Sequence, residues 1–158
     1  MHPLSLPIFE HKIQSSKTGY QIFDVVRKKY VRLTSEEWVR QHFLHYLLGH
    51  LGYPQALVRL EQGIQYNQLW HRPDIVVYSR LARPLMLVEC KAPHININQE
   101  AWEQIARYNA HCHAQLLVIT NGIEHFCWRL DYKQGNHTLL QEIPCFGTLV
   151  ESRTFDAL

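Results

Sequence analysis

Two apolar runs near the middle of the chain predict the two strands of a β-hairpin. The first run reads Ile-Val-Val-Tyr at 75–78, the second reads Leu-Met-Leu-Val-Glu-Cys at 85–90, and a polar, turn-forming segment separates them. The second run is almost continuously apolar, which is typical of a strand buried on both faces of a sheet. We therefore expect this hairpin to lie in the interior of the fold.

A helix is predicted from Thr34 to Gly49. Thr34 has the residue type of an N-cap, and Glu37 stands three positions later, so the pair fits a capping box. Apolar or aromatic residues then recur at helical spacing and predict the buried stripe, which consists of Val39, Phe43, Tyr46, Leu47 and His50. Glycines at 49 and 52 mark the end of the helix.

Two charged residues of this helix are candidates for function. Glu36 lies on the inward stripe, whereas Glu37 has a local role at the cap. Glu36 is therefore either a first-turn acid that faces the helix dipole or a site residue. Arg40 follows one turn later and either pairs with Glu36 or reaches a substrate phosphate.

The rest of the chain predicts further strands and one more helix. Strands are expected at 56–64, 115–120 and 123–130, with an edge strand at 138–140 and a helix at 98–109 that begins after Asn96 or Asn98. Residues 1–20 are expected to be irregular with at most one strand, at their end, and the segment 19–26 is expected to start with a short strand. The tail from 143 is weakly patterned. The basic run 27–32 is either a solvated segment or an edge that contacts phosphates.

Composition indicates one globular domain. The chain has 158 residues, of which 46% are hydrophobic and 19% charged. Its net charge of +2 does not by itself indicate a nucleic-acid-binding protein. No apolar run is long enough to span a membrane, and residues 1–7 lack the pattern of a secretory signal, so a cytoplasmic protein is expected. The four cysteines are widely spread, which favours reduced, buried thiols.

The predicted hairpin brings three charged side chains together. Glu89 and Lys91 are two residues apart on one strand and share a face, while Cys90 points to the other. Asp74 lies near the start of the partner strand, which faces the end of the Glu89 strand in an antiparallel hairpin. Two carboxylates and an ammonium at the edge of a buried sheet are costly, which indicates a functional site.

These residues resemble the motif of the PD-(D/E)xK nuclease superfamily. Pro73-Asp74 is followed by Glu89-Cys90-Lys91, and Gln104 and Tyr108 stand one helical turn apart on the next helix, as in RecB-like members. The resemblance implies an α/β protein with a restriction-endonuclease-like αβββαβ core, in which helices flank a mixed central sheet. The core would span about 30–131, with 1–29 and 132–158 as peripheral additions to a single domain.

More narrowly, the chain resembles the N-terminal nuclease domain of type I restriction enzyme R subunits. The matching segments lie in the same order over about residues 30–130, and they are 36–41, 52–54, 72–78, 88–93, 104–109 and 120–122. The resemblance implies a Mg²⁺-dependent DNA endonuclease, with Mn²⁺ as a substitute. DNA is the implied partner, and a separately encoded motor or specificity subunit stays open, as does the oligomeric state.

The resemblance also implies roles for individual residues. Asp74, Glu89 and the carbonyl of Cys90 would bind the metal. Lys91 would position the attacking water or stabilise charge on the phosphate. Glu36 would hold a metal-bound water or a second ion. Gln104 and Tyr108 would orient Lys91 or the substrate backbone, and Arg40 and Arg72 are expected to contact the substrate.

Other classes remain as alternatives. The same fold would also serve a non-catalytic nucleic-acid-binding or scaffold domain, in which Asp74 or Glu89 simply pairs with Lys91. The run His111-Cys112-His113 raises zinc, but no second paired element accompanies it. A Ser-His-Asp hydrolase lacks its Gly-x-Ser-x-Gly motif here.

Overall fold

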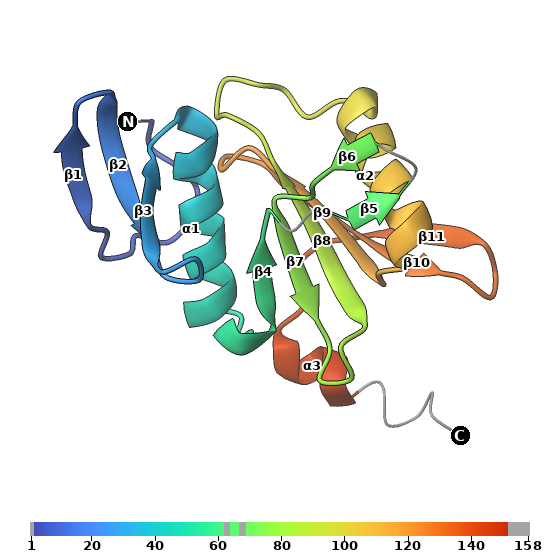
Figure 1. Cartoon of the computed structure of the whole chain (residues 1–158). Helices are drawn as coiled ribbons and strands as arrows, with labels where there is room; N and C mark the ends of the chain where they lie inside the picture. Colours follow the sequence, from blue (N-terminus) through green and yellow to red (C-terminus); the bar gives the residue numbers. More distant parts are fainter. Residues whose placement is uncertain (1, 62–63, 67–68, 152–158) are drawn as a thin grey trace.

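A six-stranded mixed sheet forms the centre of the computed structural model, which describes residues 2–61, 64–66 and 69–151 (Figure 1). The strand order is β11-β10-β9-β8-β7-β4, and only the β8–β9 pair is parallel. The strands are β4 (Val58–Leu60), β7 (Ile75–Tyr78), β8 (Pro84–Cys90), β9 (Leu116–Thr120), β10 (His125–Asp131) and β11 (Asn136–Leu140). The predicted mixed sheet, including its edge strand near 138–140, is confirmed.

The hairpin predicted from the two apolar runs is present as β7 and β8. The strands are antiparallel, with Ile75 opposite Val88, so the register sets Asp74, one residue before β7, level with Glu89. Residues 75–77 and 85–90 are all buried, as expected for strands covered on both faces.

Helices cover both faces of this sheet. α1 (Ser35–Gly49) and the short α3 (Phe146–Glu151) pack on one face, and α2 (Gln99–Cys112) packs on the other. β8 alternates between the two layers, with Met86 and Val88 toward α1 and Leu87 toward α2. α2 connects the parallel pair β8 and β9, and a parallel pair needs such a crossover.

Both predicted N-caps form. The Thr34 hydroxyl accepts a hydrogen bond from the Glu37 amide at 3.0 Å, and the Asn98 side chain accepts one from the Ala101 amide at 3.1 Å. The Glu37 carboxylate, which a capping box would return to the Thr34 amide, instead accepts from Arg27 and from Arg40. His50, assigned to the inward stripe of α1, is exposed because it lies just beyond the end of the helix.

A three-stranded antiparallel sheet precedes α1, and we call it the N-terminal meander. It consists of β1 (Ile13–Ser16), β2 (Gly19–Asp24) and β3 (Lys29–Arg32), and in Figure 1 α1 lies between it and the central sheet. β1 is the one strand expected near the end of residues 1–20, and β2 is the short strand expected at the start of 19–26. The third strand, β3, lies within the basic run and was not predicted. Ile22, in the middle strand, is fully buried, so the meander belongs to the packed fold.

Three other expectations need correction. The strand predicted at 56–64 is a 3₁₀ turn η1 (Gln55–Leu57) followed by the short β4, because Glu61 has a positive φ of 48°. Residues 62–63 lie outside the described chain, and β5 (Ile64–Tyr66) pairs with β6 (Leu69–His71) instead. The weakly patterned tail forms α3, and Cys145, expected to be buried, is exposed.

None of the helices in the described ranges combines the length and the apolar character needed to cross a membrane.

Candidate active site

Asp74 lies at the end of the central sheet with both carboxylate oxygens engaged. It is 7% exposed, and its Oδ2 accepts a 2.6 Å hydrogen bond from the backbone amide of Cys90. Its Oδ1 accepts from the Nη2 of Arg40, which reaches it from α1. This hydrogen bond from the Cys90 amide holds the Asp74 carboxylate at the end of the strand that carries Glu89 and leads into Lys91.

Glu89, Lys91 and Gln104 form a closed set of hydrogen bonds. Lys91 Nζ donates to Glu89 Oε1 at 2.8 Å, so the two side chains share a face as predicted. Gln104 on α2 donates from Nε2 to the same oxygen at 2.8 Å, and its Oε1 accepts from Lys91 Nζ at 3.2 Å. Gln104 Nε2 also lies 3.1 Å from the hydroxyl of Tyr108, one turn on. Cys90 points into the core on the α1 side.

Burial of these acids sets the electrostatics of the site. Burial, with the nearby negative charge of Asp74, raises the pKa of Glu89 to about 7 although Lys91 opposes the change. Burial also raises the pKa of Asp74, and the charge of Arg40 opposes it. Burial acts to lower the pKa of Lys91, but the hydrogen bond to Glu89 and the charges of Glu89, Asp74 and Glu36 together raise it, so the ammonium stays charged.

Glu36 and Arg40 lie beside this set. The pKa of Glu36 is raised by partial burial and by the charge of Asp74, and Lys91 acts on it in the opposite direction. Arg40 is 5% exposed and pairs with Glu36 at 3.4 Å, which was one of its two expected roles. Arg72 is exposed and precedes Asp74 by two residues. The substrate contacts predicted for Arg40 and Arg72 stay predictions.

Comparison with known proteins identifies the family of this chain. The sequence model of the type I restriction enzyme R protein N terminus matches residues 35–144, which include every predicted site residue. The chain belongs to this family. No curated protein matches the sequence.

A solved structure supports the fold of this family member. The chain superposes, with a TM-score of 0.53 and 20% identity, on a fragment assigned to an HsdR subunit of a type I restriction enzyme from Vibrio vulnificus YJ016. The match covers 75% of this chain and 26% of that one, so the chain spans about a quarter of the fragment. At this identity the likeness concerns the fold, which is consistent with the restriction-endonuclease-like core.

A charge network next to the candidate site was missed by sequence reasoning. Arg27 pairs with Asp24 at 2.6 Å, with Glu37 at 2.6 Å and with Glu61 at 2.8 Å. Arg40 continues the network to Asp74. Arg27 is thus neither the solvated residue nor the phosphate contact that the basic run 27–32 suggested, because three carboxylates enclose it.

One signal in the sequence pointed to this network. Glu61 directly follows the short strand β4, as Asp74 directly precedes β7, and the two strands are paired with Leu60 opposite Ile75. Charged residues at matched ends of neighbouring strands gather at one edge of a sheet. Asp24 and Gln41 carried no such signal, although Gln41 Nε2 donates at 2.8 Å both to Asp24 and to Glu37.

The donor set of the candidate site offers a hard divalent cation one open carboxylate oxygen. Both Asp74 oxygens already accept hydrogen bonds, from Arg40 and from the Cys90 amide, so a cation would share an Asp74 oxygen with one of these donors. Both hydrogen bonds that Glu89 accepts from described residues fall on Oε1, which leaves Oε2 for a cation. The negative charge of Asp74 raises the pKa of Glu89, and a cation bound between the two carboxylates would lower it. Arg40 Nε and Gln41 Oε1 are buried without partners in the described chain, which shows that the surrounding network is incompletely satisfied.

The described residues do not form a zinc site. No group of three His, Cys, Asp or Glu side chains placed to hold a metal occurs in the part of the chain that the structure describes. His111 and Cys112 end α2, with Cys112 buried in the α2 core, and His113 is the left-handed C-cap. The zinc alternative therefore has no support from this geometry.

Proposed function

We propose that this domain hydrolyses phosphodiester bonds of DNA in a Mg²⁺-dependent reaction. The observation that carries the proposal is the gathering of Asp74, Glu89 and Lys91 at one end of β7 and β8, with Gln104 hydrogen-bonded to both charged ends of the Glu89–Lys91 pair. Two oxygen ligands beside a charged ammonium match the requirements of phosphate chemistry.

Each residue has a definite task in this proposal. Asp74 and Glu89 would hold the ion, together with the carbonyl of Cys90, and Mn²⁺ would substitute for Mg²⁺. The bound ion would polarise the scissile phosphate and lower the pKa of a water molecule. Lys91 keeps its charge and stabilises the negative phosphate oxygens.

Three further side chains would position this set. Gln104 fixes the Lys91 ammonium through its Oε1, and Tyr108 in turn lies within hydrogen-bond distance of Gln104. Glu36 borders the site and would hold a metal-bound water. Arg40 would act through Asp74, since its guanidinium is buried among carboxylates.

A cleavage assay tests the proposal. The purified protein is incubated with linear, circular and single-stranded DNA, with Mg²⁺, with Mn²⁺ and with EDTA. Cleavage should require the metal and should be lost in Asp74→Asn and in Lys91→Ala. Lys133→Ala removes an exposed lysine from the β10–β11 loop and should cleave as wild type does. Equal metal-dependent cleavage by all variants would reject the assignment.

One observation favours a second function, a non-catalytic nucleic-acid-binding or scaffold domain. The buried Arg40 guanidinium already neutralises Asp74, as a structural ion pair does. DNA binding that does not depend on Mg²⁺, without cleavage, would support this alternative. Repeating the assay with the motor or specificity subunits of a type I system would show whether cleavage needs a separately encoded partner.

A further inference from the structure

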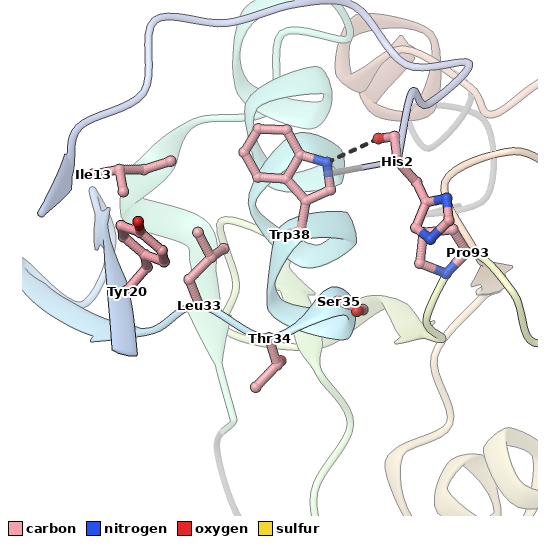
Figure 2. Close-up of a pocket in the computed structure, with 8 residues that line it drawn as sticks. All are labelled: His2, Ile13, Tyr20, Leu33, Thr34, Ser35, Trp38 and Pro93. Atoms are coloured by element: carbon pink, nitrogen blue, oxygen red, sulfur yellow. Dashed lines mark hydrogen bonds between the residues drawn. The ribbon is translucent and has the colours of Figure 1, made fainter. Parts of the chain in front are cut away.

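A cavity of about 440 Å³ lies between the N-terminal meander and the start of α1 (Figure 2). This volume is within the roughly 300–1,000 Å³ that pockets for small organic groups occupy. Its wall is mainly apolar and aromatic, and the residues that the inference uses are His2, Ile13, Tyr20, Leu33, Trp38 and Pro93. None of the functions discussed above uses this cavity.

The cavity adjoins the candidate active site. Pro93, on its wall, follows Lys91 by two residues, and Ser35, also on its wall, directly precedes Glu36. Glu36 senses the charges of Asp74 and Lys91, so the start of α1 lies within electrostatic reach of the site. A group held in the cavity would therefore sit next to a phosphate held at Asp74 and Lys91.

The aromatic rings of the cavity suit a flat, apolar ligand. Tyr20 is 65% exposed on β2, and Figure 2 shows it at one end of the cavity, with Trp38 between it and Pro93. The Trp38 indole donates to the carbonyl of His2 at 3.3 Å, which fixes the ring in place. Exposed aromatic rings beside a phosphate site stack readily on nucleobases.

Local charge supplies the attraction for a polyanion. Residues 11–33 contain six lysines and arginines and one acid, a net charge of +5, whereas the whole chain has +2 and the remainder is therefore negative. Arg27 is held by its acids, and the other five cations are exposed, namely Lys12, Lys17, Lys28, Lys29 and Arg32. Lys17 lies in the turn that leads into Tyr20, so a phosphate beside the cavity would meet this cation first. Lys12 and Arg32 lie on the opposite face of the meander, where Lys12 covers Phe23.

We propose that this cavity holds an unstacked nucleobase of the DNA strand while Lys17 binds a neighbouring phosphate and the other exposed cations of the meander add long-range attraction for the strand. The inference rests on the proposed function, because the base belongs to the strand whose phosphodiester lies at Asp74, Glu89 and Lys91. It also names the substrate class. A base within a duplex cannot enter the cavity, so the preferred substrate is single-stranded or locally unpaired DNA.

Binding of single-stranded DNA in EDTA tests the inference without cleavage. Fluorescence anisotropy of a labelled oligonucleotide is measured for the full chain and for three variants. Tyr20→Ala should weaken binding by about 5- to 150-fold, the loss of one base–aromatic stack. Tyr20→Phe keeps the ring and should bind as wild type does. Tyr30→Ala removes a ring from the opposite face of the meander and should also leave the affinity unchanged.

Oligonucleotides that lack one base at each position in turn complete the test. Wild type should lose affinity at one position, and Tyr20→Ala should show no further loss there, because the stack is already absent. Equal affinity of wild type and Tyr20→Ala for the intact oligonucleotide would overturn the inference. So would a change in sedimentation of Tyr20→Ala with unchanged DNA binding, which would assign the cavity to a second copy of the chain.

The outcomes for the two proposals are separable. Metal-dependent cleavage with Tyr20-independent binding keeps the nuclease and overturns the base site. Tyr20-dependent base binding in a protein that never cleaves keeps the base site and rejects the nuclease. Because Tyr20 is largely exposed, the variants are expected to fold, and thermal unfolding curves verify this.

Discussion

Replacing Glu89 by glutamine is expected to change how the stability of the metal-free protein depends on pH. Burial and the charge of Asp74 raise the pKa of Glu89 from 4.5 to about 7. The folded state therefore keeps this proton over a pH range in which the unfolded chain has lost it. The resulting stabilisation is complete below pH 4.5 and is lost as the pH rises through about 7.

The size of the effect follows from this pKa. At about 1.36 kcal/mol per pKa unit, the difference between 4.5 and about 7 corresponds to roughly 3 kcal/mol of unfolding free energy. Glu89 is 5% exposed, so solvent screens little of it. A neutral glutamine cannot ionise, so the variant should not lose this unfolding free energy as the pH rises.

Urea denaturation in EDTA, from about pH 4.5 to about pH 8, measures the difference. The free energy of unfolding of Glu89→Gln should rise relative to wild type by roughly 3 kcal/mol across this range, since titrating groups that do not interact with Glu89 cancel in the comparison. Glu142→Gln, an exposed acid after β11, should follow wild type. Parallel curves for Glu89→Gln and wild type would refute the reasoning.

Three further predictions concern the same site. Mg²⁺ at about 100 times its dissociation constant should raise the unfolding free energy of wild type by about 2.7 kcal/mol and leave Asp74→Asn unchanged, as measured by urea denaturation; equal shifts would place the ion elsewhere. Arg40→Gln should cost about 3–5 kcal/mol of unfolding free energy, because buried carboxylates lose their cation, whereas the exposed Arg80→Gln should cost little. Gln104→Ala should lower kcat for DNA cleavage by about 10- to 100-fold because Lys91 loses its fixed position; an unchanged kcat would remove Gln104 from the site.

The placement of Asp74, Glu89 and Lys91 was predictable because all three belong to one hairpin. Strand periodicity determines which faces the side chains take, and the antiparallel register brings the start of β7 to the end of β8. Neither step requires knowledge of distant contacts. Gln104 was predictable for a related reason, since α2 follows β8 directly and packs on the face to which Glu89 points.

The charge network was not predictable because its members come from segments far apart in sequence. The cap at Thr34 depends only on local backbone geometry, and it formed as expected. The Glu37 carboxylate can accept either from the Thr34 amide, as in a capping box, or from the guanidinium groups of Arg27 and Arg40. Arg27 and Arg40 prevail because a guanidinium brings a full positive charge to the buried carboxylate, whereas a backbone amide brings only a partial one.

The N-terminal meander was predicted only in part, without β3 and without its pairing into a sheet, because its strands carry little of the usual signal. β1 reads Ile-Gln-Ser-Ser and offers a single apolar residue. The turn between β2 and β3 contains Lys28 with a positive φ of 54°, a conformation that a lysine does not predict. Packing of Ile22 against the rest of the chain, rather than local propensity, holds these strands.

The ion pairs that run from Asp24 through Arg27 and Glu37 to Arg40 and Asp74 also bear on cooperativity. If the meander opened alone, Glu37 would lose Arg27 and keep only Arg40, which it shares with Asp74. We therefore expect the meander and the central sheet to open together. Amide hydrogens of β2 should exchange with solvent as slowly as those of β8, and residues 1–29 act as an integral part of the folding unit.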